Sequence, residues 1–229
     1  MAGQLVFPFG VEPALGHKDF ILAPCNEQAF RFVGRWPDWP ARVAAIHGPG
    51  GSGKSHLAAL WANAAGAHRL AGSALSPDRL FALSPDPGAA FLVEDFDRVE
   101  PGEIRDRALL ALFERPEGAL LLTGRAPPSD WPVVIGDLES RLRSLIGFPM
   151  WAPDDALLSA LVVKHFADRQ LAVPDAVVAR IVTQVERTPG SIAAFVARAD
   201  HKALSEKRAV TERLVLELLE SEAHMKDDG

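Results

Sequence analysis

The sequence predicts an α/β fold with a mostly parallel sheet flanked by helices, followed by a small all-helical domain. Three observations support this prediction. Short apolar runs alternate with helix-like segments through the first two thirds of the chain, as in proteins whose parallel strands are covered by helices on both faces. A glycine-rich loop separates an expected strand from a breaker-free, alanine- and leucine-rich helix. Strand signals then stop near residue 153, and only amphipathic helical patterns follow.

Each expected strand is a short apolar run that ends at proline, glycine or a charged residue. The four runs cover residues 42–47, 89–93, 119–123 and 145–150. The helices expected between them lie at residues 55–65, 104–114 and 138–143. This alternation is typical of a sheet whose strands are joined by helical crossovers.

Four amphipathic patterns follow the sheet, at residues 154–170, 174–187, 189–201 and 210–220. Two of them begin at proline, which favours the first turn of a helix. The change of pattern near residue 151 predicts a domain boundary. We therefore expect an N-terminal arm (1–12), an α/β domain (13–151), a helical domain (152–222) and a mobile tail (223–229).

The composition narrows the class of function. A net charge of −6 argues against a main role in gripping duplex DNA, which needs many Lys and Arg on one face. A single cysteine, Cys25, excludes an internal disulfide and a cysteine-based metal cluster. No apolar stretch is long enough to span a membrane, and the first residues lack the pattern of a secretory signal. We expect a cytoplasmic protein that acts on protein partners and not on membranes.

Residues 48–55, Gly-Pro-Gly-Gly-Ser-Gly-Lys-Ser, form a complete phosphate-binding loop between an expected strand and an expected helix. The glycines allow successive N–H groups to face a phosphate, and the helix adds its positive end. Lys54 is expected to reach the β- and γ-phosphate oxygens, and Ser55 to ligate Mg²⁺. The loop thus predicts ADP or ATP with Mg²⁺ as ligand, held by Gly48, Pro49, Gly50, Gly51, Ser52, Gly53, Lys54, Ser55 and His56.

Polar residues follow two further expected strands. Glu94 and Asp95 end an apolar run, where a metal-binding carboxylate is needed, so Glu94 is expected to hold Mg²⁺ through water. Asp95 would then orient the attacking water. Thr123 ends the next strand and is a candidate to sense the γ-phosphate, although a turn role before Gly124 is an alternative.

With this order of motifs the chain resembles the AAA+ ATPases, and within them the DnaA-like group, over essentially its whole length. The matching stretches are Phe-Ile-Leu at 20–22, Asn-Glu-Gln-Ala at 26–29, Leu-Thr-Gly at 122–124 followed by Pro-Pro at 127–128, and Asp-Leu-Glu-Ser-Arg-Leu at 137–142. The helical domain is then implied to be the lid of such a protein. The resemblance is most specific to the Hda regulators of replication initiation.

The resemblance implies two protein partners. Gln4, Leu5, Phe7 and Phe9 are similar to the motif that docks such regulators on the DNA sliding clamp, the DNA polymerase III beta subunit; packing of this arm on its own domain is the alternative. Arg141 takes the position of the arginine finger that would act in trans on ATP bound to DnaA. An intrachain pair with Asp137 is the alternative for this arginine.

Other implications concern DNA and assembly. The chain ends at about residue 222 apart from the tail, so we expect no helix-turn-helix domain and no sequence-specific DNA binding. The sequence leaves open whether the protein forms a homodimer.

Two departures from the family, with the inverted Glu94-Asp95 order, suggest that nucleotide is held more than hydrolysed. Arg125 and Ala126 stand where relatives commonly have an acid and then an arginine. The second-sensor arginine of the lid would fall at Gly190 or Ala193, and the nearby substitutes are Arg187 and Arg198. We expect an adaptor that stimulates ATP hydrolysis by DnaA and so prevents re-initiation. An autonomous ATPase, such as a helicase loader, is the main alternative, and a small P-loop kinase is disfavoured.

Overall fold

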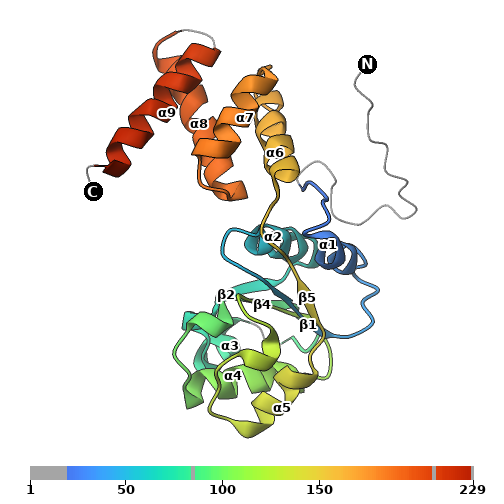
Figure 1. Cartoon of the computed structure of the whole chain (residues 1–229). Coiled ribbons are helices and arrows are strands. Elements are labelled where there is room, and N and C mark those ends of the chain that lie inside the picture. The colour runs from blue at the N-terminus through green and yellow to red at the C-terminus, as the bar shows by residue number, and fades with distance from the viewer. Residues whose placement is uncertain (1–19, 84–85, 208–209, 228–229) are drawn as a thin grey trace.

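The computed structural model describes residues 20–83, 86–207 and 210–227, with side chains up to residue 221. Five parallel strands form one sheet in the order β2-β3-β4-β1-β5, and helices lie on both of its faces (Figure 1). The expected α/β fold with a following helical segment is confirmed. The strands are β1 (Val43–His47), β2 (His68–Ala71), β3 (Phe91–Glu94), β4 (Leu120–Gly124) and β5 (Gly147–Pro149).

Side-chain alternation along the strands builds a separate core on each face of the sheet. Ile46, Leu92 and Leu121 face the helices α1 (Glu27–Val33) and α2 (Lys54–Ala65). Their neighbours in the strands, including Phe91, Val93, Leu120 and Leu122, belong to the core on the opposite face. That face is covered by α3 (Pro77–Leu83), α4 (Glu103–Glu114) and α5 (Gly136–Ser144), with short 3-10 turns η1 (Gly72–Ala74), η2 (Phe96–Arg98) and η3 (Pro128–Asp130).

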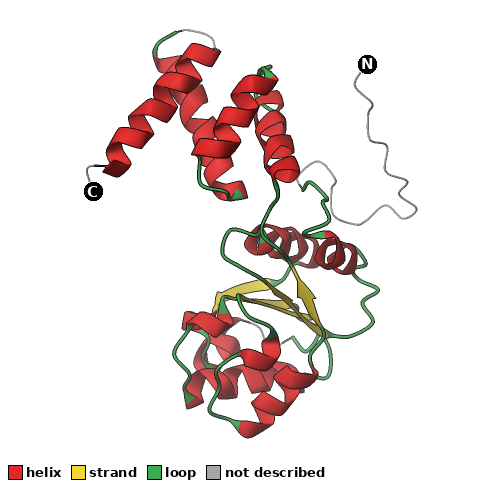
Figure 2. Cartoon of the chain, in the orientation of Figure 1, coloured by secondary structure: helices red, strands yellow, loops and turns green. Residues whose placement is uncertain are grey.

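The C-terminal helices form a third core of their own, apart from the sheet (Figure 2). Asp154 and Thr188 cap two of these helices, accepting hydrogen bonds from the N–H groups of Leu157 (2.8 Å) and Ser191 (3.0 Å). The cluster contains α6 (Asp155–Ala167), α7 (Asp175–Gln184), α8 (Pro189–Ser205) and α9 (Glu212–Asp227). Within the described ranges, no helix is long and apolar enough to cross a membrane.

Three elements of the α/β part were not expected, namely α1, α3 and β2. β2 pairs with β3 only, and Leu70 is its one buried residue, so the strand carries no apolar run. Helix α9 continues to Asp227, past the expected end at residue 220 and into the segment expected to be mobile. The expected arm at residues 1–12 lies outside the described residues.

The lid helices contact the phosphate loop at one tight point. A Cβ built on Gly51 would lie 2.3 Å from Cγ2 of Thr188, the residue that caps α8, and Gly51 has a φ of 74°. A side chain at this position therefore meets both backbone strain and a clash. The contact lets the start of α8 sit directly on the loop.

Gly51→Ala is expected to lower the free energy of unfolding by about 1–3 kcal/mol, because of the strained φ and the clash with Thr188. Adding Thr188→Ser removes the methyl group and should recover only the part due to the 2.3 Å contact, because Cβ of residue 188 would still lie 2.8 Å from the new methyl group. Gly50→Ala is the matched control, since its Cβ would make ordinary contact, 3.6 Å from Arg125. Urea unfolding measures all four proteins. If Gly51→Ala had the same free energy of unfolding as wild type, Gly51 of the loop and Thr188 of the lid would not be in contact.

Candidate functional site

The phosphate loop leaves β1 at a junction of three strands. The N–H of Gly48 donates to the carbonyl of Gly124 at the end of β4 (3.2 Å), and Met150, directly after β5, donates to the carbonyl of His47 (2.7 Å). A Cβ on Gly48, whose φ is 150°, would lie 1.9 Å from the carbonyl oxygen of Met150. Only glycine fits here. The loop is thereby placed at the carboxyl edge of the sheet, where α/β proteins commonly bind ligands.

Lys54 opens α2 and is buried, with 6% of its surface exposed. Its ammonium donates to the carbonyl oxygens of Gly48 (2.7 Å) and Pro49 (2.9 Å). Burial lowers the pKa of Lys54, and the charge of Arg125 lowers it further, while Asp95 and Asp97 raise it. The lysine is therefore held inside the loop among charged groups of both signs.

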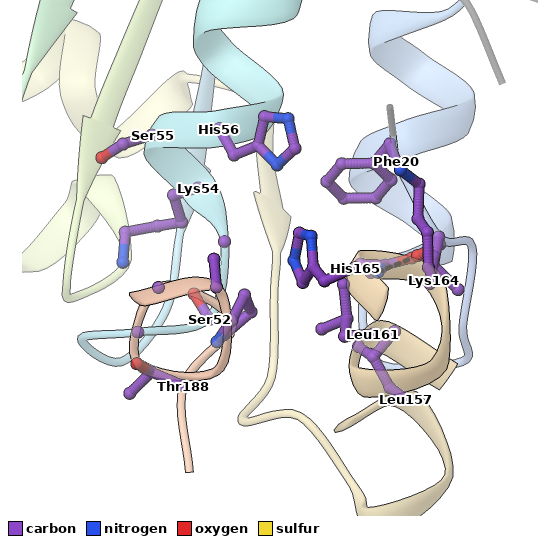
Figure 3. A pocket seen from close by; sticks show the side chains of 17 residues that line it. Phe20, Ser52, Lys54, Ser55, His56, Leu157, Leu161, Lys164, His165 and Thr188 are labelled. Atoms are coloured by element: carbon purple, nitrogen blue, oxygen red, sulfur yellow. Dashed lines mark hydrogen bonds between the residues drawn. The ribbon is translucent and has the colours of Figure 1, made fainter. Parts of the chain in front are cut away.

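A cavity of about 450 Å³ lies between the phosphate loop, the segment before α1, and the lid helices α6 and α8. Figure 3 shows Lys54, Ser52 and Thr188 at one end and the rings of Phe20, His56 and His165 at the other. The expected loop residues 51–56 all line it. Gly48, Pro49 and Gly50 belong to the same loop but do not line the cavity.

Of the three rings at this end of the cavity, His56 was among the predicted nucleotide-binding residues, and Phe20 and His165 were not. The ring of Phe20 stacks on Phe30 (centroids 5.2 Å apart) and lies 5.6 Å from the ring of His56. Asn26 fixes the segment after Phe20, because its amide donates to the carbonyl of Ile21 (3.0 Å) and accepts from the N–H of Ala23 (2.9 Å). This end is mainly aromatic, with Lys164 beside Phe20, whereas the loop end presents the phosphate loop and Lys54.

The lid supplies the remaining wall. Burial lowers the pKa of His165, and the nearby cations Lys164 and Arg169 lower it further, so this imidazole favours its neutral form. Leu157 and Leu161 of α6 line the same wall. Their apolar spacing is that of any helix facing a core, so no sequence signal separates them from core residues.

The two candidate positions of the missing lid arginine, Gly190 and Ala193, both line the cavity. The nearby arginines do not. Arg187 pairs with Asp155, and the guanidinium of Arg198 lies 5.7 Å from the ring centroid of Phe195.

The candidate acids take different partners. The carboxylate of Glu94 accepts a hydrogen bond from Arg69 on the neighbouring strand β2 (3.1 Å). Asp95 follows β3 in a left-handed conformation (φ 52°), and its charge acts on Lys54. The N–H of Asp95 donates to the hydroxyl of the fully buried Thr123 (3.0 Å). Thr123 thus ties the ends of β3 and β4 together.

Arg141 lies on α5, on the sheet face opposite to α2 and the lid (Figure 1). Its guanidinium pairs with Asp137 (3.2 Å) and lies 3.6 Å from a carboxylate oxygen of Glu114. The side chain is 37% exposed and does not line the cavity. The structure therefore contains the intrachain pair named as the alternative. Gln4, Leu5, Phe7 and Phe9 lie outside the described residues.

No family model and no curated protein is similar enough in sequence to match this chain. The structure is similar to domain III of the replication initiation protein DnaA from Thermotoga maritima, with a TM-score of 0.75, 14% identity, and coverage of 93% of this chain and 98% of that one. It is also similar to AMPPCP-bound DnaA from Aquifex aeolicus, with a TM-score of 0.72, 16% identity, and coverage of 93% and 71%.

A more distant likeness is to the RuvB Holliday junction branch migration motor of Thermotoga maritima, with a TM-score of 0.60, 18% identity, and coverage of 80% of this chain and 62% of that one. At such identities the similarity concerns the fold. The chain has the fold of DnaA domain III: a five-stranded parallel sheet flanked by helices and followed by a group of C-terminal helices.

Proposed function

We propose that this chain binds an adenine nucleotide in the cavity between the phosphate loop and the lid. The observation that carries the proposal is the contrast between the two ends of that cavity: N–H groups at the start of α2 beside Lys54, and aromatic and apolar side chains around Phe20. An amphipathic ligand with phosphates at one end and a base at the other fits this contrast. The similar DnaA of Aquifex aeolicus was solved with AMPPCP bound.

A second detail supports a phosphate at the loop end. The hydroxyl of Ser52 is buried within the loop and has no hydrogen-bond partner among the described residues. Buried polar atoms are rarely left unpaired, so an oxygen-rich ligand is the natural partner.

Mg²⁺ suits the donors at this end, because hydroxyl and carboxylate oxygens are its preferred ligands. Ser55 would supply the hydroxyl. Glu94 was expected to supply the carboxylate, but it pairs closely with Arg69 (3.1 Å), whereas Asp95 pairs more loosely with Arg98 (3.8 Å) and acts on Lys54, which favours Asp95 for this role. When bound, the ion would offset charge on the phosphates.

The same pairing bears on hydrolysis. The carboxylate of Glu94 forms an ion pair with Arg69. Among the described residues, no arginine of the lid lines the cavity. A site that holds phosphates without these groups retains nucleotide better than it hydrolyses it. We therefore propose slow intrinsic turnover, with ADP or ATP as the bound ligand.

Lys54→Ala is expected to abolish nucleotide retention, because the variant removes the cation that compensates the β-phosphate. Mass spectrometry of the ligand released on denaturation, together with titration of AMPPCP, measures the effect. Lys202→Ala, in the last turn of α8 and outside the cavity, is the control. Equal nucleotide content in wild type and Lys54→Ala would contradict the proposal.

We further propose that the chain acts as a clamp-docked regulator of DnaA of the Hda type. The shared fold supports this reading, because AAA+ domains of one shape can stack so that one supplies an arginine to the next. Arg141 is suited to that task, since it is partly exposed and lies away from its own cavity. Gln4 and Leu5 would anchor the arm on the clamp.

Arg141→Ala is expected to leave folding and nucleotide binding intact and to remove the stimulation of ATP hydrolysis by DnaA, where a finger contributes about 10³–10⁵ in rate. Arg143→Ala is a close control, because Arg143 lies on the same helix and also pairs one turn back, with Glu139. The measurement is conversion of DnaA-bound ATP to ADP in the presence of DNA-loaded clamp. Full stimulation by Arg141→Ala would reject the finger, and fast turnover without DnaA would favour an autonomous ATPase.

A further inference from the structure

Arg125 stands directly after β4, in a loop that a carboxylate holds in place. The N–H groups of Arg125 and Ala126 donate to one oxygen of Asp97 (2.6 and 3.0 Å). Asp97 lies just beyond β3, so the exits of two adjacent strands are tied together. The backbone position of Arg125 is therefore fixed without the help of its own side chain.

The side chain of Arg125 reaches to the tip of the phosphate loop. Nη2 and Cζ of its guanidinium lie 3.6 and 3.8 Å from the place of a Cβ on Gly50. The residue is exposed, and among the described residues no carboxylate lies within ion-pair distance of it. Arg69, Arg141 and Arg187 differ, because each has a carboxylate partner. Arg125 is thus a cation with free donors beside the loop.

Arg125 also acts on Lys54 through its charge. It lowers the pKa of Lys54, although the carboxylates of Asp95 and Asp97 raise it, so the two cations repel each other beside these two acids. A phosphate group between them would turn that repulsion into attraction, and a guanidinium is the side chain best suited to grip two phosphate oxygens.

The sheet order indicates which phosphate this would be. β4 lies on the β3 side of β1, and the rings of Phe20 and His165 lie at the other end of the cavity from Lys54 (Figure 3). A nucleotide with its base among the rings extends its phosphates towards the loop tip. Arg125 does not itself line the cavity but lies beside Gly50 at that tip, so the phosphate nearest to it would be the last one.

We propose that Arg125 binds the terminal phosphate of a nucleoside triphosphate held in its own chain's cavity, and so makes the site prefer triphosphate to diphosphate. This inference rests on the proposed nucleotide site. Arg125 takes over a charge that Gly190 and Ala193 of the lid do not supply.

The test measures affinities of nucleotide-stripped wild type and Arg125→Ala for AMPPCP and for ADP, with Mg²⁺, by calorimetry. Arg125→Ala is expected to weaken the binding of AMPPCP about 10–100-fold, which is the usual loss for a hydrogen-bonded charged pair. The binding of ADP should weaken less than about 3-fold. Arg125→Glu should weaken AMPPCP further, because it places a negative charge beside the phosphate. Arg107→Ala, an exposed arginine on α4, is the control and should change neither affinity.

Equal loss for both nucleotides, or no loss for either, would overturn the role of Arg125 while leaving the nucleotide site in place. Failure of wild type to bind either nucleotide would overturn both proposals. Circular dichroism and a urea transition check that each variant is folded, and the backbone anchoring by Asp97 predicts that Arg125→Ala unfolds at the same urea midpoint as wild type.

Discussion

The site depends on one close approach of backbone, where the phosphate loop leaves β1. Gly48 lies against the carbonyl of Met150 so closely that a Cβ cannot be accommodated, and its N–H donates to the carbonyl of Gly124. Because Met150 and Gly124 directly precede the linker to the lid and the loop of Arg125, this junction also places both of those segments. The positions of the phosphate loop, the lid and the candidate terminal-phosphate contact therefore all depend on this one junction at the edge of the sheet.

The second constraint is the packing of the lid on the loop. Thr188 caps α8 and touches Gly51, so the first turn of α8 closes one side of the cavity. Phe20 and His165 close the opposite end with rings. A ligand in this space would contact the α/β part and the lid together, which gives the chain a means to couple nucleotide binding to the placement of the lid.

The sequence predicted the fold class and the loop because both have local signals, namely apolar runs between breakers and a complete glycine-rich motif. β2 has no such signal, since Leu70 alone is buried. The pairing of Glu94 with Arg69 joins residues 25 positions apart, and the hydrogen bond that fixes the backbone of Arg125 is accepted by Asp97, 28 positions earlier. Long-range contacts of this kind depend on the order of the strands in the sheet. The sequence predicted only four strands and missed β2, so it could not predict that order.

The central claim is that one ligand contacts both the phosphate loop and the start of α8. Hydrogen exchange of the nucleotide-stripped chain, with and without Mg²⁺ and AMPPCP, tests it most directly, because backbone amides report each segment separately. We predict slower exchange at residues 50–56 and at residues 190–193, with exchange at residues 212–219 of α9 unchanged. Protection confined to the loop, or absent from both segments, would contradict it.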